Sequence, residues 1–168
     1  MKLIHVFRAG MPAKEIPDVP DAAKEVGAAY VDLYKGMGFV PPWLGYFTLD
    51  ESVCIGTCGF KSPPVANRVE IAYCTLPGFE GRGYATGMAE ALIECGRMAD
   101  MKVVIAAQTL PQEGASTTML RRLGFAMVGT VDHPEDGPVW EWQLPNNALL
   151  VTCEDARAGA QALCGGRR

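Results

Sequence analysis

A glycine-rich turn between a strand and a helix constrains this chain most. The turn reads GFEGRGYAT, residues 78–86, and it separates an expected strand over Arg68–Thr75 from an expected helix over Ala85–Ala99. The stretch KVVIAAQ, from Lys102, is a nearly continuous apolar run, which is typical of a strand buried on both faces. If the two strands are neighbours, a helical crossover requires them to run parallel, with a right-handed connection. The pattern therefore predicts a parallel strand–helix–strand unit.

The turn itself allows two interpretations. Gly81 and Gly83 carry no side chains, so a ligand can approach their backbone, and Arg82 adds a fixed positive charge. The first amides of a helix have no internal partners, and the helix dipole favours an anion there, so the turn could bind a pyrophosphate. The other interpretation is a glycine turn that only begins a helix. The nine residues alone do not decide between them.

The rest of the chain predicts an α+β fold with a single mixed, mostly antiparallel sheet flanked by helices. The expected strands and helices are Lys2–Phe7, a helix over about Asp21–Lys35, a hairpin of Leu44–Leu49 and Ser52–Phe60, a helix over Ala115–Leu123 that stops at Gly124, and a hairpin of Phe125–Val131 and Val139–Leu144. Its length predicts one domain over residues 1–145, followed by a partly mobile tail over 146–168. The apolar patch Ala148–Val151 could serve a homodimer or pack on its own core.

Composition narrows the class of protein. The formal net charge is −4, without a long basic run, which argues against nucleic acid as a partner. No run of about 18 apolar residues is present, so we expect no membrane span and a cytoplasmic protein. The six cysteines and two histidines show neither a disulfide framework nor a metal-ligand spacing, so we expect reduced thiols and no metal.

Two segments in order carry a family resemblance. The stretch VEIAYCTLPGFEGRGYATGMAEAL, followed by IAAQTLPQEGASTTMLRRLGF, resembles the GNAT superfamily of acetyl-CoA-dependent N-acetyltransferases. It looks most like the branch of the ribosomal-protein alanine/serine acetyltransferases. The superfamily's cofactor motif is Gln/Arg-x-x-Gly-x-Gly/Ala, and residues 80–85 match it from the glycine onward. The likeness spans roughly Leu44–Leu144.

The resemblance implies a GNAT fold and a position for acetyl-CoA. Its pyrophosphate would lie on the amides of the glycine turn, and its pantetheine arm would run beside Tyr73 and Thr75, where the parallel strands splay. Ser116 would lie toward the other side of the coenzyme, with Arg121 or Arg122 as further candidates. The turn residues that the resemblance assigns to the cofactor are Gly81, Arg82, Gly83, Tyr84, Ala85 and Thr86.

Three positions depart from the family pattern. Glu80 stands where Gln or Arg is usual, and a carboxylate beside a pyrophosphate is unfavourable unless it points to water. Glu113 stands where this branch often has Asn. Leu120 stands where many relatives have a tyrosine that protonates the leaving thiolate, which a leucine cannot do. The last departure is tolerable because a thiolate, with a thiol pKa of about 8.5, leaves readily.

Glu70 is the candidate base for transfer of the acetyl group to a primary amine. Strand alternation gives it the same face as the small residues Ala72 and Cys74, which leaves room for a substrate beside the carboxylate. The alternative is a solvated carboxylate at a strand start. An amide near Tyr73 or Cys74 would hold the oxyanion. Tyr73 is either an acid or a core aromatic, and Cys74 is either a nucleophile or a small buried thiol.

The acceptor stays open between a protein N-terminus and a small amine. Two segments are candidate walls of the acceptor site. The alternative for the first is a place in the core, and the alternative for the second is a solvated hairpin tip. The two segments are the aromatic stretch Phe39, Trp43, Tyr46 and Phe47, and the acidic loop Asp132, Glu135 and Asp136. A different class of function is a CoA-binding regulatory or interaction module without turnover.

Overall fold

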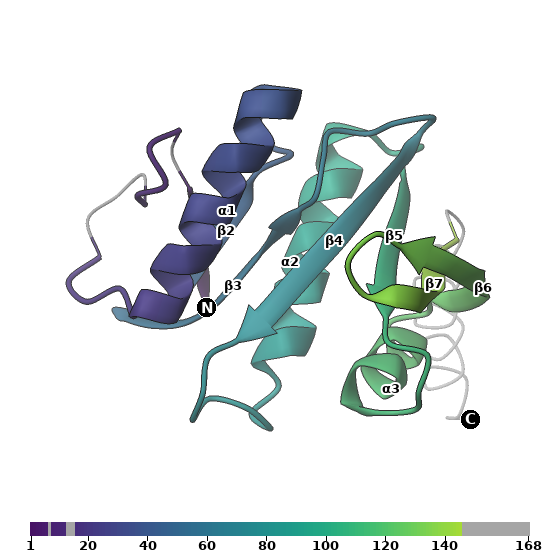
Figure 1. Ribbon diagram of the computed structural model, residues 1–168. Coiled ribbons are helices and arrows are strands. Elements are labelled where there is room, and N and C mark those ends of the chain that lie inside the picture. Colours follow the sequence, from purple (N-terminus) through teal and green to yellow (C-terminus); the bar gives the residue numbers. More distant parts are fainter. Residues whose placement is uncertain (7, 13–15, 146–168) are drawn as a thin grey trace, which may run out of the picture.

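Seven strands and three helices make up the part of the chain that the computed structural model describes, residues 1–6, 8–12 and 16–145 (Figure 1). The strands are β1 (Lys2–His5), β2 (Gly45–Asp50), β3 (Val53–Phe60), β4 (Arg68–Thr75), β5 (Val104–Thr109), β6 (Ala126–His133) and β7 (Gly137–Leu144). The helices are α1 (Asp21–Met37), α2 (Tyr84–Ala99) and α3 (Ala115–Arg122).

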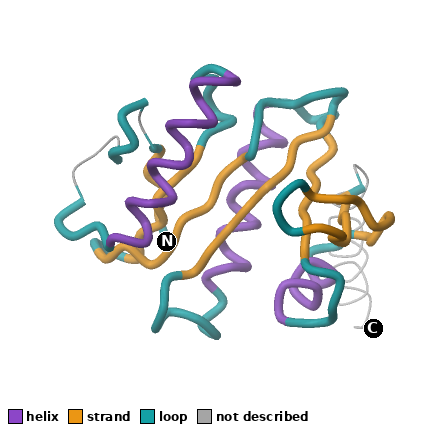
Figure 2. Tube along the Cα trace, in the orientation of Figure 1, coloured by secondary structure: helices purple, strands orange, loops and turns teal. Residues whose placement is uncertain are grey.

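The strands form one sheet in the order β1-β2-β3-β4-β5-β7-β6. Among the strands of the described residues, only β4 and β5 run parallel, and α2 is the crossover between them. The other neighbouring pairs are antiparallel, and Figure 2 shows the long diagonal run of β4 through the middle of the sheet. This is the predicted fold class: a mixed, mostly antiparallel sheet with one parallel strand–helix–strand unit.

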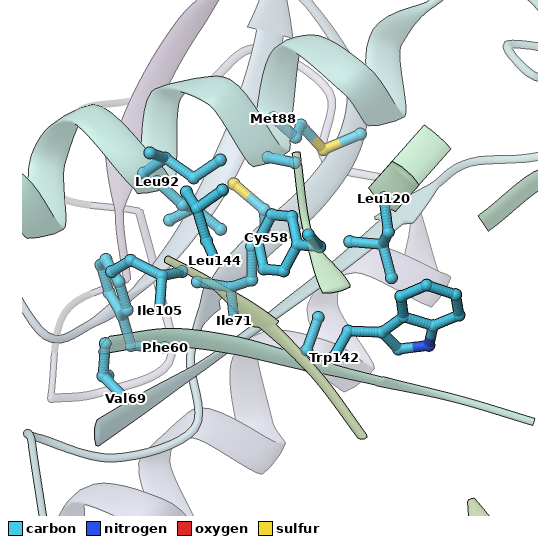
Figure 3. Packing of buried hydrophobic residues seen from close by; sticks show 14 of the residues in the cluster. Cys58, Phe60, Val69, Ile71, Met88, Leu92, Ile105, Leu120, Trp142 and Leu144 are labelled. Atoms are coloured by element: carbon cyan, nitrogen blue, oxygen red, sulfur yellow. The ribbon is translucent and has the colours of Figure 1, made fainter. Parts of the chain in front are cut away.

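The helices cover both faces of the sheet (Figure 1). Tyr30 of α1 packs directly over Gly45 and Gly59, where any side chain on the glycines would clash with its ring. On the opposite face, α2 brings Gly96 against Ile105. Two apolar clusters result, one under α1 and one between the sheet, α2 and α3. Figure 3 shows ten labelled members of the second cluster, drawn from β3, β4, β5, β7 and both helices.

Most predicted elements are confirmed, some with small shifts. The bounds of β4 agree with the expected strand, and Gly124 after α3 has the left-handed φ of 86° that suits the end of a helix. The first strand ends earlier than expected, at His5, and α1 continues through Gly36 to Met37. The tail, with its patch Ala148–Val151, lies outside the described residues.

Of the two alternatives for the aromatic stretch, substrate wall or core, the structure favours core for Trp43, Tyr46 and Phe47. Phe47 is 1% exposed and packs under α1. Trp43 lies edge-on to Phe60 at 5.0 Å between ring centroids, and Tyr46 also packs on the larger cluster. These rings are buried because they lie between the helices and the sheet, where removal of their apolar surface from water is favourable.

Within the described residues, four cysteines are free thiols: Cys54, Cys58, Cys74 and Cys95. None of the described helices is long and apolar enough to cross a membrane. Among the same residues, no group of three or more His, Cys, Asp or Glu side chains could hold a metal ion.

Candidate active site

The parallel strands β4 and β5 diverge after three pairs of residues. Their register runs from Arg68 opposite Val104 to Glu70 opposite Ala106 and goes no further, whereas β4 stays paired with β3 up to Thr75. The splay predicted between these strands is therefore present. Among the described residues, no strand pairs with this edge of the second half of β4.

Backbone alternation decides which groups face this gap. The carbonyl of Glu70 accepts from Lys61 beyond β3, and the N–H of Leu76 donates to Ile55, so even-numbered residues of β4 face β3. Successive residues of a strand point their backbone groups to opposite edges. The N–H and C=O of Tyr73 therefore face the gap, whereas those of Cys74 face β3.

A cavity of about 680 Å³ lies between the glycine turn, β4 and α3. We call it the glycine-loop cavity. Eight of the nine residues that the sequence assigns to the cofactor line it: Tyr73, Thr75, Gly81, Gly83, Tyr84, Ala85, Thr86 and Ser116. Arg122 lines it as well. The ninth, Arg82, does not, because its guanidinium lies over the ring of Phe79, 5.7 Å from the centroid.

The glycine turn has the backbone that the sequence suggested. Gly81 and Gly83 have φ values of 72° and 82°, a region that other residues rarely adopt. No side chain caps the N-terminus of α2. Its first amides are therefore available to a ligand from the cavity.

Two polar side chains hold the turn in shape. Glu80 folds back and accepts a hydrogen bond of 2.7 Å from the N–H of Gly78. Tyr84 donates a hydrogen bond of 2.5 Å to Asp50, which ties the start of α2 to the turn between β2 and β3. This bond to a carboxylate, together with burial, raises the pKa of the Tyr84 hydroxyl. Asp50 is one of the contacts that the sequence analysis missed.

A second cavity, of about 390 Å³, lies on the other side of Tyr73, and we call it the Glu70 cavity. Its lining comes from β4, β5 and the loop before α3, and includes Lys61, Glu70, Gln108 and Glu113. The two cavities share three lining residues: Tyr73, Ala115 and Ser116. Glu70 and the glycine turn thus open onto two cavities that meet at Tyr73.

Glu70 is a buried, doubly paired carboxylate, so its interpretation as a solvated group is wrong. It is 9% exposed. Lys61 Nζ lies 2.8 Å from Glu70 Oε1, and Arg68 Nη2 lies 3.3 Å from Oε2. The two cations offset the cost of burying the charge. They also hold the carboxylate at the wall of its cavity.

A network of polar side chains holds Arg68, one of the two cations that pair with Glu70. Arg68 donates to both oxygens of Glu141, at 2.7 Å through Nε and 2.8 Å through Nη2. Gln108 donates to the same carboxylate at 3.1 Å. The sequence pattern predicts no role for these residues. One signal was available: Glu141 stands between two tryptophans on a strand, where a buried carboxylate needs a partner.

Tyr73 packs on the larger core cluster and lines both cavities, so it is more than a core aromatic. Burial raises the pKa of its hydroxyl to about 12, although a hydrogen bond with the Ser116 side chain acts in the opposite direction. The hydroxyl therefore keeps its proton at neutral pH. Leu120, by contrast, is fully buried.

Arg121 and Glu113, which both lie near α3, pair with each other. Arg121 donates to both oxygens of Glu113, at 2.6 and 2.7 Å, and lies over the ring of Trp142 at 5.1 Å. The hydrogen bond with Arg121 is the main reason why the pKa of Glu113 is lowered. Of the two adjacent arginines, Arg122 is the one that lines the glycine-loop cavity.

At the end of the β6–β7 hairpin, the predicted acidic wall is an exposed turn. Its Asp136 lies 3.2 Å from His133 Nδ1, and none of the acidic residues lines either cavity. This hairpin tip therefore matches its alternative as a solvated turn.

Comparison with known proteins gives one family. A sequence model of the acetyltransferase (GNAT) domain matches residues 10–126. Among curated proteins, none matches the chain.

Several solved structures share the fold at low sequence identity. One is an aminoglycoside acetyltransferase in complex with coenzyme A, with 21% identity and a TM-score of 0.56 over 65% of this chain and 69% of that one. A spermidine N-acetyltransferase variant from Vibrio cholerae has 11% identity and a TM-score of 0.64 over 89% and 98%. A ribosomal L7/L12 acetyltransferase with coenzyme A has 16% identity and a TM-score of 0.58 over 75% and 72%. The ribosomal-protein branch is thus one neighbour among several.

Proposed function

Because this chain belongs to the GNAT acetyltransferase family, we propose that it transfers the acetyl group of acetyl-CoA to a primary amine by direct attack. One observation carries the proposal. The glycine-loop cavity and the Glu70 cavity meet at Tyr73 and Ser116, so a donor held in one can present its acyl group to an acceptor held in the other.

The residues of the glycine-loop cavity fit the donor. The uncapped amides at the start of α2 suit a pyrophosphate, and Arg122 supplies a cation across the cavity. The exposed backbone edge at Tyr73 suits an extended arm with amides of its own. Acetyl-CoA has both features, and it supplies the activated acyl group.

Three groups of the chain would perform the transfer. An amine is nucleophilic only without its extra proton, and Glu70 would receive that proton directly or through a water molecule. The N–H of Tyr73, which faces the gap, would donate a hydrogen bond to the oxygen that gains charge on attack. The Tyr73 hydroxyl would protonate the departing thiolate. In many relatives a tyrosine at the position of Leu120 has this role.

The acceptor is proposed only as a primary amine, either a small molecule or a protein N-terminus. The structural neighbours are named for aminoglycosides, spermidine and a ribosomal protein, and these acceptors share little beyond an amine. Fold alone does not choose among them. The carboxylate of Glu70 in its cavity supports attraction of a cationic amine.

The test begins with a thermal-shift titration of the full chain with acetyl-CoA. A ligand at a hundred times its dissociation constant adds about 2.7 kcal/mol. We expect a rise in Tm of roughly 5–10 °C for a domain of this size, absent with ATP. Thiol release is then measured with spermidine, an aminoglycoside and a peptide with a free N-terminus. A shift without acceptor-dependent thiol release would favour a binding module without turnover, and no shift at millimolar acetyl-CoA would refute the proposal.

A further inference from the structure

Lys61 directly follows β3 and is fixed to Glu70 in two ways. Its backbone N–H donates to the Glu70 carbonyl at 2.9 Å, and its Nζ lies 2.8 Å from Glu70 Oε1. The Lys61 side chain is 42% exposed, whereas that of Glu70 is 11% exposed. The backbone of Lys61 is therefore anchored while its side chain keeps access to solvent.

The Lys61 ammonium has the chemistry of the proposed acceptor. It is a primary amine on an unbranched chain, and it contacts the carboxylate that would take a proton from an acceptor. Among the described lysines, only Lys61 lines the Glu70 cavity. In contrast, Lys24 and Lys35 of α1 pair with aspartates three positions earlier on the same helix.

We propose that Lys61 is a self-acetylation site, modified by acetyl-CoA when no other amine fills the Glu70 cavity. This proposal rests on the proposed function. The Lys61 ammonium gives one proton to Glu70, and its Nζ forms a bond to the acetyl carbon. The bond from that carbon to sulfur breaks, the second proton that Nζ loses passes to the departing sulfur, and coenzyme A leaves as the thiol. The products are Nζ-acetyl-lysine, the free thiol and one proton, which passes from Glu70 to solvent.

The distances along the chain permit the step. Glu70 and Tyr73 are three residues apart on β4, which is about 10 Å at 3.3 Å per residue. Both residues line the Glu70 cavity, together with Lys61, and Tyr73 also lines the glycine-loop cavity. The flexible four-carbon side chain of Lys61 and the acetyl end of the donor can close this span from opposite sides.

Acetylation would remove the charge that now pairs with Glu70. An amide nitrogen carries no positive charge, so only Arg68 would remain as a cation against that carboxylate. The Glu70–Lys61 contact would then open on the cavity side. Self-acetylation would thus alter the electrostatics of the proposed acceptor site itself.

The test needs no acceptor. The full chain is incubated with acetyl-CoA alone, and acetylation of each lysine is followed by peptide mass spectrometry. Lys24 is the matched control, because its Nζ also lies 2.8 Å from a carboxylate but lines neither cavity. We expect Lys61 to react about a hundred times faster than Lys24, the lower end of what a positioned base contributes. Glu70→Gln should bring Lys61 down to the rate of Lys24.

The outcomes separate this proposal from the proposed function. A thermal shift with acetyl-CoA, together with equal rates at Lys61 and Lys24, would overturn self-acetylation and leave the acetyltransferase proposal standing. Preferential reaction of Lys61 that persists in Glu70→Gln would also overturn it, because the base would have no part. No thermal shift and no preference for Lys61 would overturn both proposals.

Discussion

Arg68 reaches from β4 across β5 to hold Glu141 on β7, with hydrogen bonds of 2.7 and 2.8 Å to its two oxygens. Both residues lie on the face of the sheet that carries Glu70. On β5, the residue in register with Glu70 is Ala106, whose small side chain leaves room for this crossing. The pair joins the two halves of the sheet just before β4 and β5 diverge.

Arg68→Met should therefore destabilise the protein. It would leave Glu141, which is 6% exposed, as a buried carboxylate without its cation. We expect a loss of about 3 kcal/mol in the free energy of unfolding, at the low end for buried pairs because the Arg68 side chain is 33% exposed. Urea denaturation measures this. The double variant Arg68→Met with Glu141→Leu should recover part of the loss, and no recovery would contradict the pairing argument.

Glu70→Gln should lower acetyl transfer by about a hundredfold or more, since a positioned base contributes at least this factor. Acetyl-CoA affinity should stay unchanged, because Glu70 does not line the glycine-loop cavity. Thiol release and the thermal shift measure the two properties. Full activity of the variant would end the role of Glu70.

Gly83→Asp should abolish binding of acetyl-CoA, because it adds bulk and negative charge at the proposed pyrophosphate position. The φ of 82° also makes any side chain strained there. Gly83→Ala is the matched control: it brings the strain without the charge and should weaken binding less. Isothermal titration calorimetry gives both affinities. Equal affinities for the wild type and the aspartate variant would refute the phosphate site.

Tyr73→Phe should lower kcat by about tenfold, less than the usual effect of a lost acid because a thiolate leaves easily. Burial raises the pKa of this hydroxyl to about 12, above its unfolded value of about 10. A raised pKa means that the folded protein keeps the proton and that ionisation begins to matter only as pH approaches 12. Measurement of kcat against pH for both proteins tests this. Any fall in the kcat of the wild type between pH 8 and about 10 should also be present in Tyr73→Phe, because it would come from another group.

Glu80→Gln should tighten acetyl-CoA binding by roughly two- to fivefold, since it removes a negative charge next to the proposed pyrophosphate without changing the size of the side chain. The free protein should lose slightly in stability, by about 0.5 kcal/mol, because a neutral amide accepts the hydrogen bond from the Gly78 N–H less strongly than the carboxylate does. Calorimetry and thermal unfolding measure the two effects. Weaker binding by Glu80→Gln would show that Glu80 supports the turn more than it repels the ligand.

The sequence predicts the order of the elements well because their signals are local. Glycine and proline mark the turns, and apolar periodicity separates strand from helix, as at β4 and α2. The family motif likewise predicts a cluster of residues around the glycine turn, and eight of its nine candidates line one cavity.

The contacts of the candidate base were beyond local reasoning. Arg68 and Glu141 are 73 positions apart, and only the β4-β5-β7 strand order brings them together. Lys61 was an ordinary loop residue in the sequence, yet strand pairing sets it beside Glu70. For the aromatic stretch, the sequence leaves two alternatives open for a different reason. Its composition suits a binding wall and a core equally, and packing against α1 and α2 decides for the core.

The divergence of β4 from β5 has a consequence for ligand choice. Beyond Glu70, none of the strands in the described part of the chain pairs with this edge of β4, and the backbone of Tyr73 faces it. A guest that is extended and carries its own amides can bond there as a strand would, whereas a nucleotide alone cannot. If acetyl-CoA binds there as proposed, its recognition would depend in part on main-chain atoms that no side-chain substitution removes.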